Sequence, residues 1–420
     1  MKFSRTANVC LSRSAPYLVL AVGVCVTPFA LAQSRSGGST QNLLPTRTAD
    51  DRSENNRIDS GALKVPMGAT PGSAPNSAVL AYIPNQSGNN VWVIDTSNNT
   101  IVSTVTVGEA PMGVAVNPDG TRAYVTNNSL PGTVSVIDTC SNAVVATVAV
   151  GHGPWGVAVK PDGTRAYVVN NLANNLSVID TSNNTVVATV GVGLNPVGVA
   201  VKPDGSRAYV TNGNSNDGTV SVIDTSNNTM VASVPVGGVP AGVALKPDGT
   251  RAYVANEDSS VKVIDTSSNT VVATITVTGF PDNVAVTPDG AHAYVPNSGN
   301  NTVSVIDTSI DTVVATLPVG TDPFGVAVTP DGSLAYVANV NSGSLSVIDT
   351  STNTVIDTVS INGSPGALGE FIGTAPCGSP TPTPTPTVTP SVTPTSTPTP
   401  SVIPRPHPTP RPRPTPHPRS

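Results

Sequence analysis

An Ile-Asp-Thr tripeptide recurs seven times along the chain, and its spacing constrains the fold more than any other feature. Successive copies lie 41 to 44 residues apart, with the acid at Asp95, Asp138, Asp180, Asp224, Asp265, Asp307 and Asp349. A fixed period of this length is typical of propellers and solenoids, in which each repeat buries its apolar surface only against its neighbours. We therefore expect seven structural repeats in the middle of the chain.

The repeat at residues 113–150 distinguishes between these two architectures. Residues 113–116 predict a short strand, and the Asn-Pro-Asp-Gly sequence after it predicts a tight turn, because Pro presets φ and Gly accepts a positive φ. Residues 122–127, 133–138 and 143–150 predict three further strands, and no stretch has a helical period. Four antiparallel strands per repeat make a propeller blade, whereas a β-solenoid needs shorter, parallel rungs. We expect an all-β, seven-bladed β-propeller.

Side-chain size predicts the order of the strands within each blade. The first strand of each repeat consists of Gly, Val and Ala, as the narrow centre of a blade requires. The second and third strands are rich in Val, Ile and Tyr, which suits strands buried on both faces. The fourth strand contains Pro235 and Pro318, and Pro is confined to edges or bulges, so this strand is predicted at the outer edge.

The two ends of the repeat region predict how the ring closes. The first repeat begins near Ala78 and lacks an inner strand, while a spare strand sequence at residues 365–372 follows the last repeat. We expect this C-terminal strand to become the inner strand of the first blade. The ring then has no unpaired inner edge.

The N-terminal residues have the pattern of a secretory signal peptide. Basic residues precede an apolar run at residues 17–30, and Ala-Leu-Ala at residues 30–32 fits the cleavage rule, which predicts a mature start at Gln33. The alternative is an uncleaved membrane anchor, but the run is shorter than the ~20 residues that a spanning helix needs. We therefore expect an exported protein that is periplasmic, at the cell surface or secreted, with no transmembrane segment after cleavage.

Two further segments flank the propeller, which we place at residues 77–377. Residues 33–76 are rich in Ser, Asn, Thr, Arg and Asp and predict a flexible linker. Residues 378–420 consist mainly of Pro, Thr, Ser, Val, Arg and His, and they predict a disordered tail that favours polyproline II. The arginines of this tail either contact an anionic surface or belong to a solvated linker; they are Arg405, Arg411, Arg413 and Arg419.

The second strands carry a tetrapeptide that resembles the repeat of the YVTN family of β-propellers. Tyr-Val-Thr-Asn itself occurs at residues 124–127 and 209–212, and variants of it occur at 82–85, 167–170, 253–256, 294–297 and 336–339. The resemblance implies surface or periplasmic proteins of bacteria and archaea, and it implies no shared catalytic residues. The family is also similar to lactonase-like propellers, a more distant relation.

Most of the recurring charged residues are predicted to have structural roles. The Pro-Asp-Gly acids could form a metal-binding ring, but we interpret them as turn residues; they are Asp119, Asp162, Asp204, Asp248, Asp289 and Asp331. The Ile-Asp-Thr acids are expected to cap the turns that follow them. Four arginines beside Pro-Asp-Gly are expected to offset those acids rather than to bind phosphate; they are Arg122, Arg165, Arg207 and Arg251.

A ligand site is predicted where the repeats differ, in the Gly-x-x-Pro-x-Gly frame between one blade and the next. The residue after Pro varies around the ring, and propeller geometry places these residues at one mouth of the channel. Large apolar groups with a few acids and a His at a concave mouth are typical of a ligand site. The predicted ligand-binding residues are Met112, Trp155, Phe324, Phe280, His152, Glu109, Asp282 and Asp322. The alternative is that Trp155 and Phe324 only plug the channel.

No arrangement of residues in the sequence supports catalysis. There is no Ser-His-Asp pattern, no Gly-rich phosphate loop and no haem attachment motif, and we expect no metal and no cofactor. We interpret the protein as a non-catalytic binding scaffold for a protein or carbohydrate at the cell surface, and as a monomer. The alternative is a lactonase-like hydrolase that uses Glu109, His152, Asp282 and Asp322 at the same mouth.

Charge and cysteine content restrict the remaining possibilities. Residues 77–377 contain 8 Lys and Arg residues and 22 Asp and Glu residues, an excess of 14 negative charges. Nucleic acid is therefore a disfavoured partner, since phosphate binding needs a basic patch. Cys140 and Cys377 remain after cleavage; both are predicted on one face of the propeller but at different radii, so whether they form a disulfide stays open.

Overall fold

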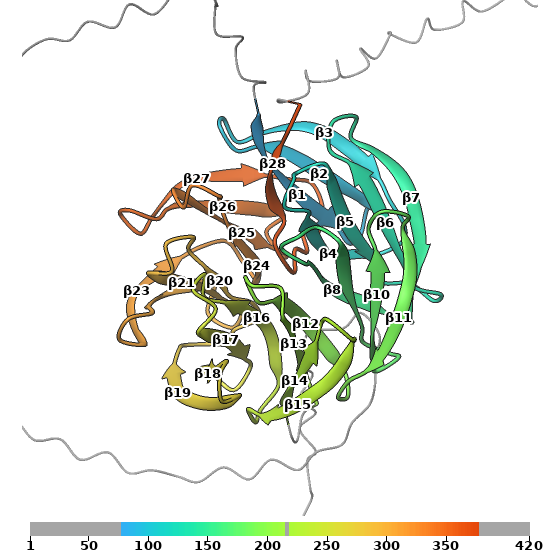
Figure 1. Cartoon of the computed structure of the whole chain (residues 1–420). Coiled ribbons are helices and arrows are strands. Elements are labelled where there is room, and N and C mark those ends of the chain that lie inside the picture. Colours follow the sequence, from blue (N-terminus) through green and yellow to red (C-terminus); the bar gives the residue numbers. More distant parts are fainter. Residues whose placement is uncertain (1–76, 215–217, 378–420) are drawn as a thin grey trace, which may run out of the picture. The chain divides into compact units, whose positions relative to one another are not determined.

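The protein is described from a computed structural model, which covers residues 77–214 and 218–377 (Figure 1). The predicted signal peptide, linker and tail lie outside these residues. The described residues form strands, turns and loops without any helix, so none of them forms a helix that could cross a membrane.

The strands form seven four-stranded sheets arranged as blades around a centre (Figure 1). The innermost strands, from blade 1 to blade 7, are β28 (Ile372–Ala375), β4 (Pro111–Val116), β8 (Pro154–Val159), β12 (Pro196–Val201), β16 (Pro240–Leu245), β20 (Ala285–Val286) and β24 (Pro323–Val328). The second strands are β1 (Ala78–Asn85), β5 (Arg122–Asn127), β9 (Arg165–Asn170), β13 (Arg207–Asn212), β17 (Arg251–Asn256), β21 (His292–Asn297) and β25 (Leu334–Asn339).

The outer half of each blade has the same regularity. The third strands are β2 (Asn90–Asp95), β6 (Thr133–Asp138), β10 (Asn175–Asp180), β14 (Thr219–Asp224), β18 (Ser260–Asp265), β22 (Thr302–Asp307) and β26 (Ser344–Asp349). The outer strands are β3 (Thr100–Thr106), β7 (Ala143–Ala149), β11 (Thr185–Gly191), β15 (Thr229–Pro235), β19 (Thr270–Thr276), β23 (Thr312–Pro318) and β27 (Thr354–Ser360). The prediction of a seven-bladed propeller with four antiparallel strands per blade is confirmed.

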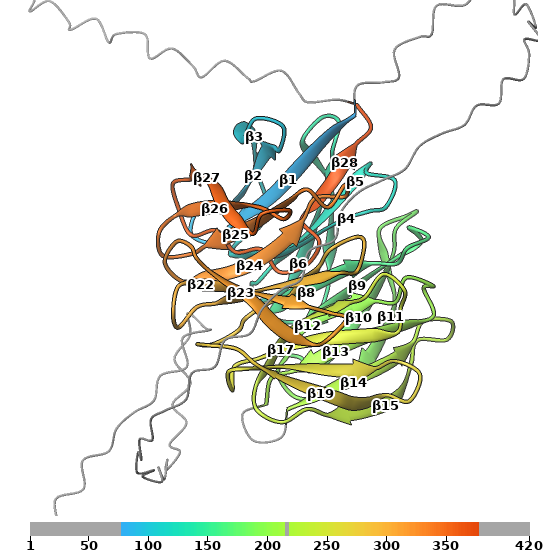
Figure 2. The ribbon, with the colours of Figure 1, turned by 90° about the vertical axis from the view of Figure 1, so that its left-hand side faces the viewer.

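The C-terminal strand completes the first blade, as the sequence predicted. β28 pairs antiparallel with β1, so that Ala78 lies opposite Ala375 and Ala81 lies opposite Ile372. Figures 1 and 2 show the start of β1 beside the end of β28, where the two ends of the repeat region meet. Every blade therefore has an inner strand, and β1 is paired on both sides.

The predicted bounds of this closing strand are wrong, however. Residues 365–372 were expected to form it, but the ladder with β1 begins at Ile372. Upstream, Pro365 makes an isolated bridge to Asn85, and the N–H of Gly366 donates to the carbonyl oxygen of Pro84 at 3.0 Å. Between Gly366 and Ile372 the chain leaves the sheet, because Leu368 bridges to Gly113 of blade 2 and packs into the centre of the ring. Burial of this apolar side chain therefore moves the strand toward the C-terminus.

Four tyrosines of the repeated tetrapeptide connect one blade to the next. The tetrapeptide rings are among the largest fully buried side chains of the propeller. Tyr336 of blade 7 donates a hydrogen bond to Oδ1 of Asn99 in blade 1 at 2.6 Å, and Tyr253 of blade 5 donates to Asp311 of blade 6 at 2.9 Å. Tyr209 and Tyr294 make the equivalent bonds. At these four positions the ring fills the space between two blades and the hydroxyl links them.

The recurring acids have turn-capping roles. Oδ1 of Asp95 accepts a hydrogen bond from the backbone N–H of Ser97 at 2.9 Å, and Oδ1 of Asp119 accepts one from Thr121 at 2.9 Å. The same bonds recur at the other Ile-Asp-Thr and Pro-Asp-Gly acids, which confirms both interpretations.

The partner predicted for the four arginines is wrong. Arg165, for example, forms an ion pair of 2.8 Å with Asp180, an Ile-Asp-Thr acid, rather than with the Pro-Asp-Gly acid Asp162. Arg122, Arg207 and Arg251 make the equivalent ion pairs. The start of the second strand lies opposite the end of the third strand in the antiparallel register, which brings these two positions together. Lys160 instead pairs with Asp162, at 2.8 Å.

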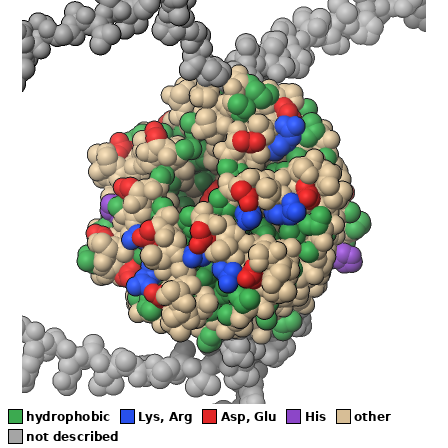
Figure 3. Space-filling model, viewed as in Figure 1, with side chains coloured by type: hydrophobic (Ala, Val, Ile, Leu, Met, Phe, Trp, Pro, Cys, Tyr) green, Lys and Arg blue, Asp and Glu red, His purple; other side chains and the backbone are tan. Residues whose placement is uncertain are grey.

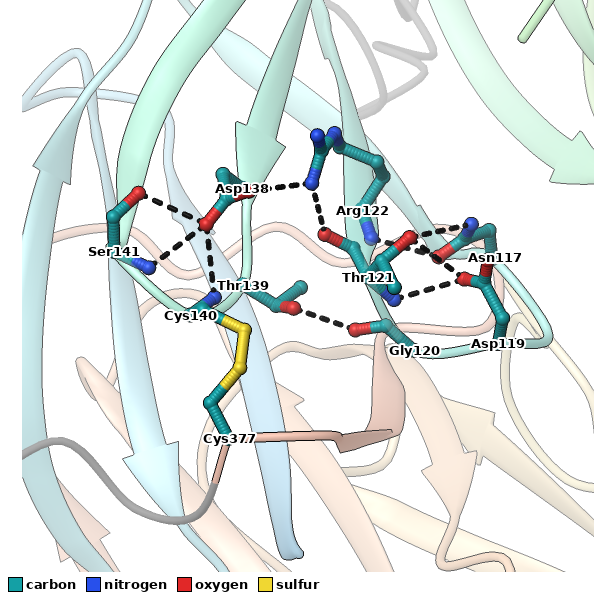
Figure 4. The surroundings of a disulfide bond; sticks show 10 residues. All are labelled: Asn117, Asp119, Gly120, Thr121, Arg122, Asp138, Thr139, Cys140, Ser141 and Cys377. Carbon is teal, nitrogen blue, oxygen red and sulfur yellow. Dashed lines mark hydrogen bonds and ion pairs between the residues drawn. A yellow bond between two sulfur atoms is a disulfide. The ribbon is translucent and has the colours of Figure 1, made fainter. Parts of the chain in front are cut away.

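Cys140 and Cys377 form a disulfide, the question that the sequence left open (Figure 4). Cys140 lies in the turn between β6 and β7 of blade 2, and Cys377 follows β28 of blade 1. The turn is held by Asp138, whose Oδ1 accepts hydrogen bonds from the backbone N–H groups of Cys140 and Ser141 at 3.1 and 2.9 Å. The bond therefore attaches the closing strand covalently to the neighbouring blade.

Candidate functional site

The central channel has two different ends. The end formed by the connections from fourth to first strands, which include Met112, Trp155, Asp282 and Phe324, is called the loop face. The opposite end, formed by turns between first and second strands such as residues 117–120, is called the turn face. Figures 1 and 3 look onto the turn face, which carries the Lys and Arg side chains of the ion pairs described above.

An apolar cluster fills the centre of the ring at the loop face. Met112, Trp155 and Leu368 are buried together, with Val197 and Phe324 packed against them. The blades approach so closely here that a Cβ atom added at Gly113 would lie 2.2 Å from the carbonyl oxygen of Trp155. Only glycine fits at that position, which explains the last Gly of the Gly-x-x-Pro-x-Gly frame.

The predicted ligand-binding residues therefore differ in their exposure. Met112 and Trp155 are buried, with 6% and 8% of their surfaces exposed, as a plug requires. Phe324 and Asp322 are half-buried, and Asp282 is buried. The exposed members are Glu109, His152 and Phe280.

Asp282 follows Pro281 in blade 6, at the position that Met112 and Trp155 occupy in blades 2 and 3. In blade 6 the Gly-x-x-Pro-x-Gly sequence differs from that of the other blades. Asn283 replaces the usual Gly, and β20 is only two residues long. The Oδ2 atom of Asp282 accepts no hydrogen bond from the described residues. Burial raises the pKa of Asp282 to about 8; the neighbouring hydroxyl of Ser298 opposes this shift, while the charges of Glu257 and Asp322 add to it.

Exposed apolar side chains also occur in the loops of the loop face. Phe280, which the sequence analysis identified, is 56% exposed. Leu130 and Leu172 lie in loops between second and third strands, and Leu194 lies in the connection to blade 4; their exposed fractions are 68%, 60% and 55%. Sequence reasoning missed these three leucines, although each is an apolar residue within a polar loop.

The channel is hollow toward the turn face. A cavity of about 570 Å³ is lined by the inner strands and reaches the prolines of the Pro-Asp-Gly turns. Figure 3 shows the corresponding hollow in the middle of this face, with acidic and basic side chains around it. Sequence reasoning did not predict this cavity, because it located the concave mouth at the loop face.

The described residues do not assemble a metal centre. No group of three or more His, Cys, Asp or Glu side chains within residues 77–214 and 218–377 is placed to hold a metal ion.

Residues 156–361, which span blades 3 to 7, match the family model of the choice-of-anchor I domain. This part of the chain is therefore similar to that domain. The comparison with curated protein sequences gives no match.

Several solved structures share the propeller fold. Hydrazine synthase of Kuenenia stuttgartiensis has a TM-score of 0.61 and 24% identity, over 68% of this chain and 99% of that chain. A functionally unknown protein from Desulfotomaculum acetoxidans has a TM-score of 0.61 and 21% identity, over 71% and 99% of the two chains. The dihydro-heme d1 dehydrogenase NirN has a TM-score of 0.51 and 20% identity, over 69% and 74%. These similarities show the fold, and two of the three names denote enzymes, so they do not separate binding from catalysis.

Proposed function

We propose that this protein is an exported, non-catalytic binding scaffold whose loop face binds a protein partner. The observation that supports this most directly is the gathering of exposed apolar side chains on one face. Leu130, Leu172, Leu194 and Phe280 are exposed in loops of the same face as the buried cluster of Met112, Trp155 and Leu368. Single exposed apolar residues are ordinary, but several of them on a face that also has a rigid apolar centre favour an interface.

The charges of this face favour a basic partner. The described loops of the loop face contain no Lys or Arg and carry Glu109, Asp322, the half-buried Glu257 and Asp258, which pairs with Lys262 of β18. Asp282 adds a buried carboxyl group with one oxygen that lacks a hydrogen bond within the described residues. A partner that presents Lys or Arg among apolar side chains is complementary to both properties.

Three observations support the cellular setting within this proposal. The match to the choice-of-anchor I domain favours a protein that acts at the cell surface. The disulfide between Cys140 and Cys377 favours an oxidising compartment, where such bonds persist. The occurrence of the tetrapeptide in the second strand of every blade supports the resemblance to the YVTN family. We further propose that the propeller acts as a monomer.

The proposal is tested by capturing surface proteins with the chain that begins at Gln33 and with two matched variants. The loop-face variant replaces four exposed apolar residues with Asn: Leu130, Leu172, Leu194 and Phe280. The rim control replaces four residues of similar exposure on the outer strands with Thr: Val187, Val231, Val272 and Ile356. Both variants are first compared with the wild type by thermal melting.

We expect one partner to be captured by the wild type and the rim control but not by the loop-face variant. Because binding energy concentrates in a few central residues, the affinity for the purified partner should fall by more than about 2 kcal/mol. Equal capture by all three proteins would contradict a binding site on this face.

A further inference from the structure

The cavity that opens on the turn face is independent of the proposed loop-face interface. Its walls combine the backbone of the inner strands with apolar side chains, since each of blades 3 to 7 contributes one half-buried apolar residue at the equivalent position: Val159, Val201, Leu245, Val286 and Val328. Its volume, about 570 Å³, falls within the range of about 300–1,000 Å³ that is typical of small-molecule sites. The cavity is therefore large enough for a small molecule with an apolar body.

One charged side chain, Glu370, is found among the described residues that line this cavity. Its backbone is fixed to blade 2, because the carbonyl oxygen of Glu370 accepts a hydrogen bond from the N–H of Val116 at 3.1 Å. The carbonyl oxygen of Leu368, two residues earlier, accepts one from Val114 at 2.9 Å, so the segment that presents the glutamate is held in place. The backbone of Glu370 thus has a defined position beside the channel.

The carboxyl group of Glu370 forms no ion pair or hydrogen bond with any described side chain. Its surface is accessible inside the channel, yet protein surrounds it, and this burial raises its pKa. A carboxylate without a counter-charge is stabilised by a cation that can approach it. The ligand that satisfies both the walls and the carboxylate carries a positive charge on an apolar body.

The rim of the cavity does not offer free cations to an anionic ligand. Lys160, Lys202 and Lys246 precede the Pro-Asp-Gly turns of blades 3 to 5, and each pairs with the Asp of its own turn at 2.8 to 3.5 Å. The corresponding residues of blades 2, 6 and 7 are Asn117, Thr287 and Thr329, whose turns carry an Asp without a lysine. The excess of acids at this mouth favours the approach of a cation.

We propose that the channel is a binding site for a small amine with an elongated apolar body, whose ammonium group pairs with Glu370. The amine enters from the turn face, and its hydrocarbon chain lies against the half-buried apolar side chains of the inner strands, such as Val159 and Val201. The site is separate from the loop-face interface, so either can exist without the other.

The test uses isothermal titration calorimetry with n-hexylammonium, n-hexanol and hexanoate as probes. These three share one hydrocarbon chain and differ in the charge of the head group. The proteins are the wild type, Glu370→Gln, Glu370→Asp and the control Glu109→Gln, which changes an exposed acid on the loop face. Thermal melting first establishes that each variant is folded.

We expect hexylammonium to bind the wild type and Glu109→Gln with equal affinity, and to bind Glu370→Gln about tenfold or more weakly, as the loss of a charged partner implies. Glu370→Asp retains a carboxylate and should still prefer hexylammonium to hexanol. If Glu370→Gln does not fold, this preference in Glu370→Asp decides the test. Absence of binding, equal binding to Glu370→Gln, or hexanoate binding as tightly as hexylammonium would overturn the proposal.

Discussion

Cys140 and Cys377 are joined by a disulfide, with their Cα atoms 5.4 Å apart, although 237 positions separate them in the sequence. The bond connects the residue after the closing strand β28 to a turn of blade 2. Blade 1 is thus joined to blade 2 by a covalent bond in addition to packing and hydrogen bonds. The effect of the disulfide on stability can be measured separately from the effect of strand β28.

We expect Cys140→Ser to lower the free energy of unfolding by about 2–5 kcal/mol, because the bond restricts an unfolded chain over a long loop. Urea unfolding without reductant measures the difference. Wild-type protein with reductant should match the variant, and thiol counting of the denatured, unreduced chain that begins at Gln33 should find no free thiol. Identical urea midpoints, or two free thiols, would contradict the assignment.

Removal of all residues after Asn362 should abolish cooperative unfolding, since β1 then loses its partner β28 and exposes an inner edge. Thermal melting and size-exclusion chromatography should show a broad transition and aggregates. The matched control is a chain that ends at Cys377, which keeps the strand and should melt like the full chain. A sharp transition in the shorter chain would refute closure by β28.

Trp155 and Phe280 should respond differently to alanine. Trp155 is 8% exposed within the buried cluster that it forms with Met112 and Leu368, so Trp155→Ala should lower the free energy of unfolding by about 3–5 kcal/mol. Phe280 is 56% exposed, so Phe280→Ala should leave the melting temperature nearly unchanged but weaken partner binding by about 2 kcal/mol. Melting and affinity are measured on the same two variants. Unchanged affinity in Phe280→Ala would show that Phe280 does not belong to the interface.

Asp282 should make stability depend on pH. Its folded pKa, about 8, lies above the value of about 3.9 in an unfolded chain, so the folded state retains a proton that the unfolded state has lost. Stability therefore falls as the pH rises from about 4 to about 8. The stabilisation by Asp282→Asn relative to wild type should grow between pH 5 and pH 8 by up to about 4 kcal/mol, measured by urea unfolding. Glu109→Gln serves as the control, and a pH-independent difference for Asp282→Asn would argue against a neutral buried Asp282.

Metal analysis of the chain that begins at Gln33 should find no stoichiometric metal, and the protein should not hydrolyse lactones. The lactonase-like alternative needs Glu109, His152, Asp282 and Asp322 to act together, and the described residues contain no group of three placed to hold a metal ion. Lactone hydrolysis that a chelator abolishes and a metal restores would establish that alternative.

The architecture was predictable because the same pattern of strands and turns recurs in every repeat. The predicted second and third strands of blade 2, at residues 122–127 and 133–138, coincide with β5 and β6. The bounds of the closing strand were predicted wrongly because this strand occurs only once in the sequence. Leu368 is buried in the central cluster with Met112 and Trp155 and is not paired in the sheet of blade 1. A repeat pattern cannot predict a feature, such as this shift of the closing strand, that occurs in one blade alone.

The site was less predictable, since it depends on side chains from different blades meeting at the centre. The sequence predicted Trp155 and Phe324 at the mouth of the channel, as ligand-binding residues or as a plug, but their packing against Leu368 depends on the path of the last strand. Which end of the channel is open follows from that packing. Likewise, the proximity of Cys140 and Cys377 depends on the turn between β6 and β7, whose position no spacing in the sequence specifies.

The ring closure also determines how the propeller responds to mechanical force. Ala78 and Ala375 are paired at one end of the β1–β28 ladder, so tension between the two chain ends would peel this ladder open one hydrogen bond at a time. The disulfide changes the path of that force. A pull on the chain beyond Cys377 passes through the sulfur atoms into blade 2, and the ladder is bypassed. A protein held to a surface by one end and to a partner by its body would thus resist shear through a covalent bond.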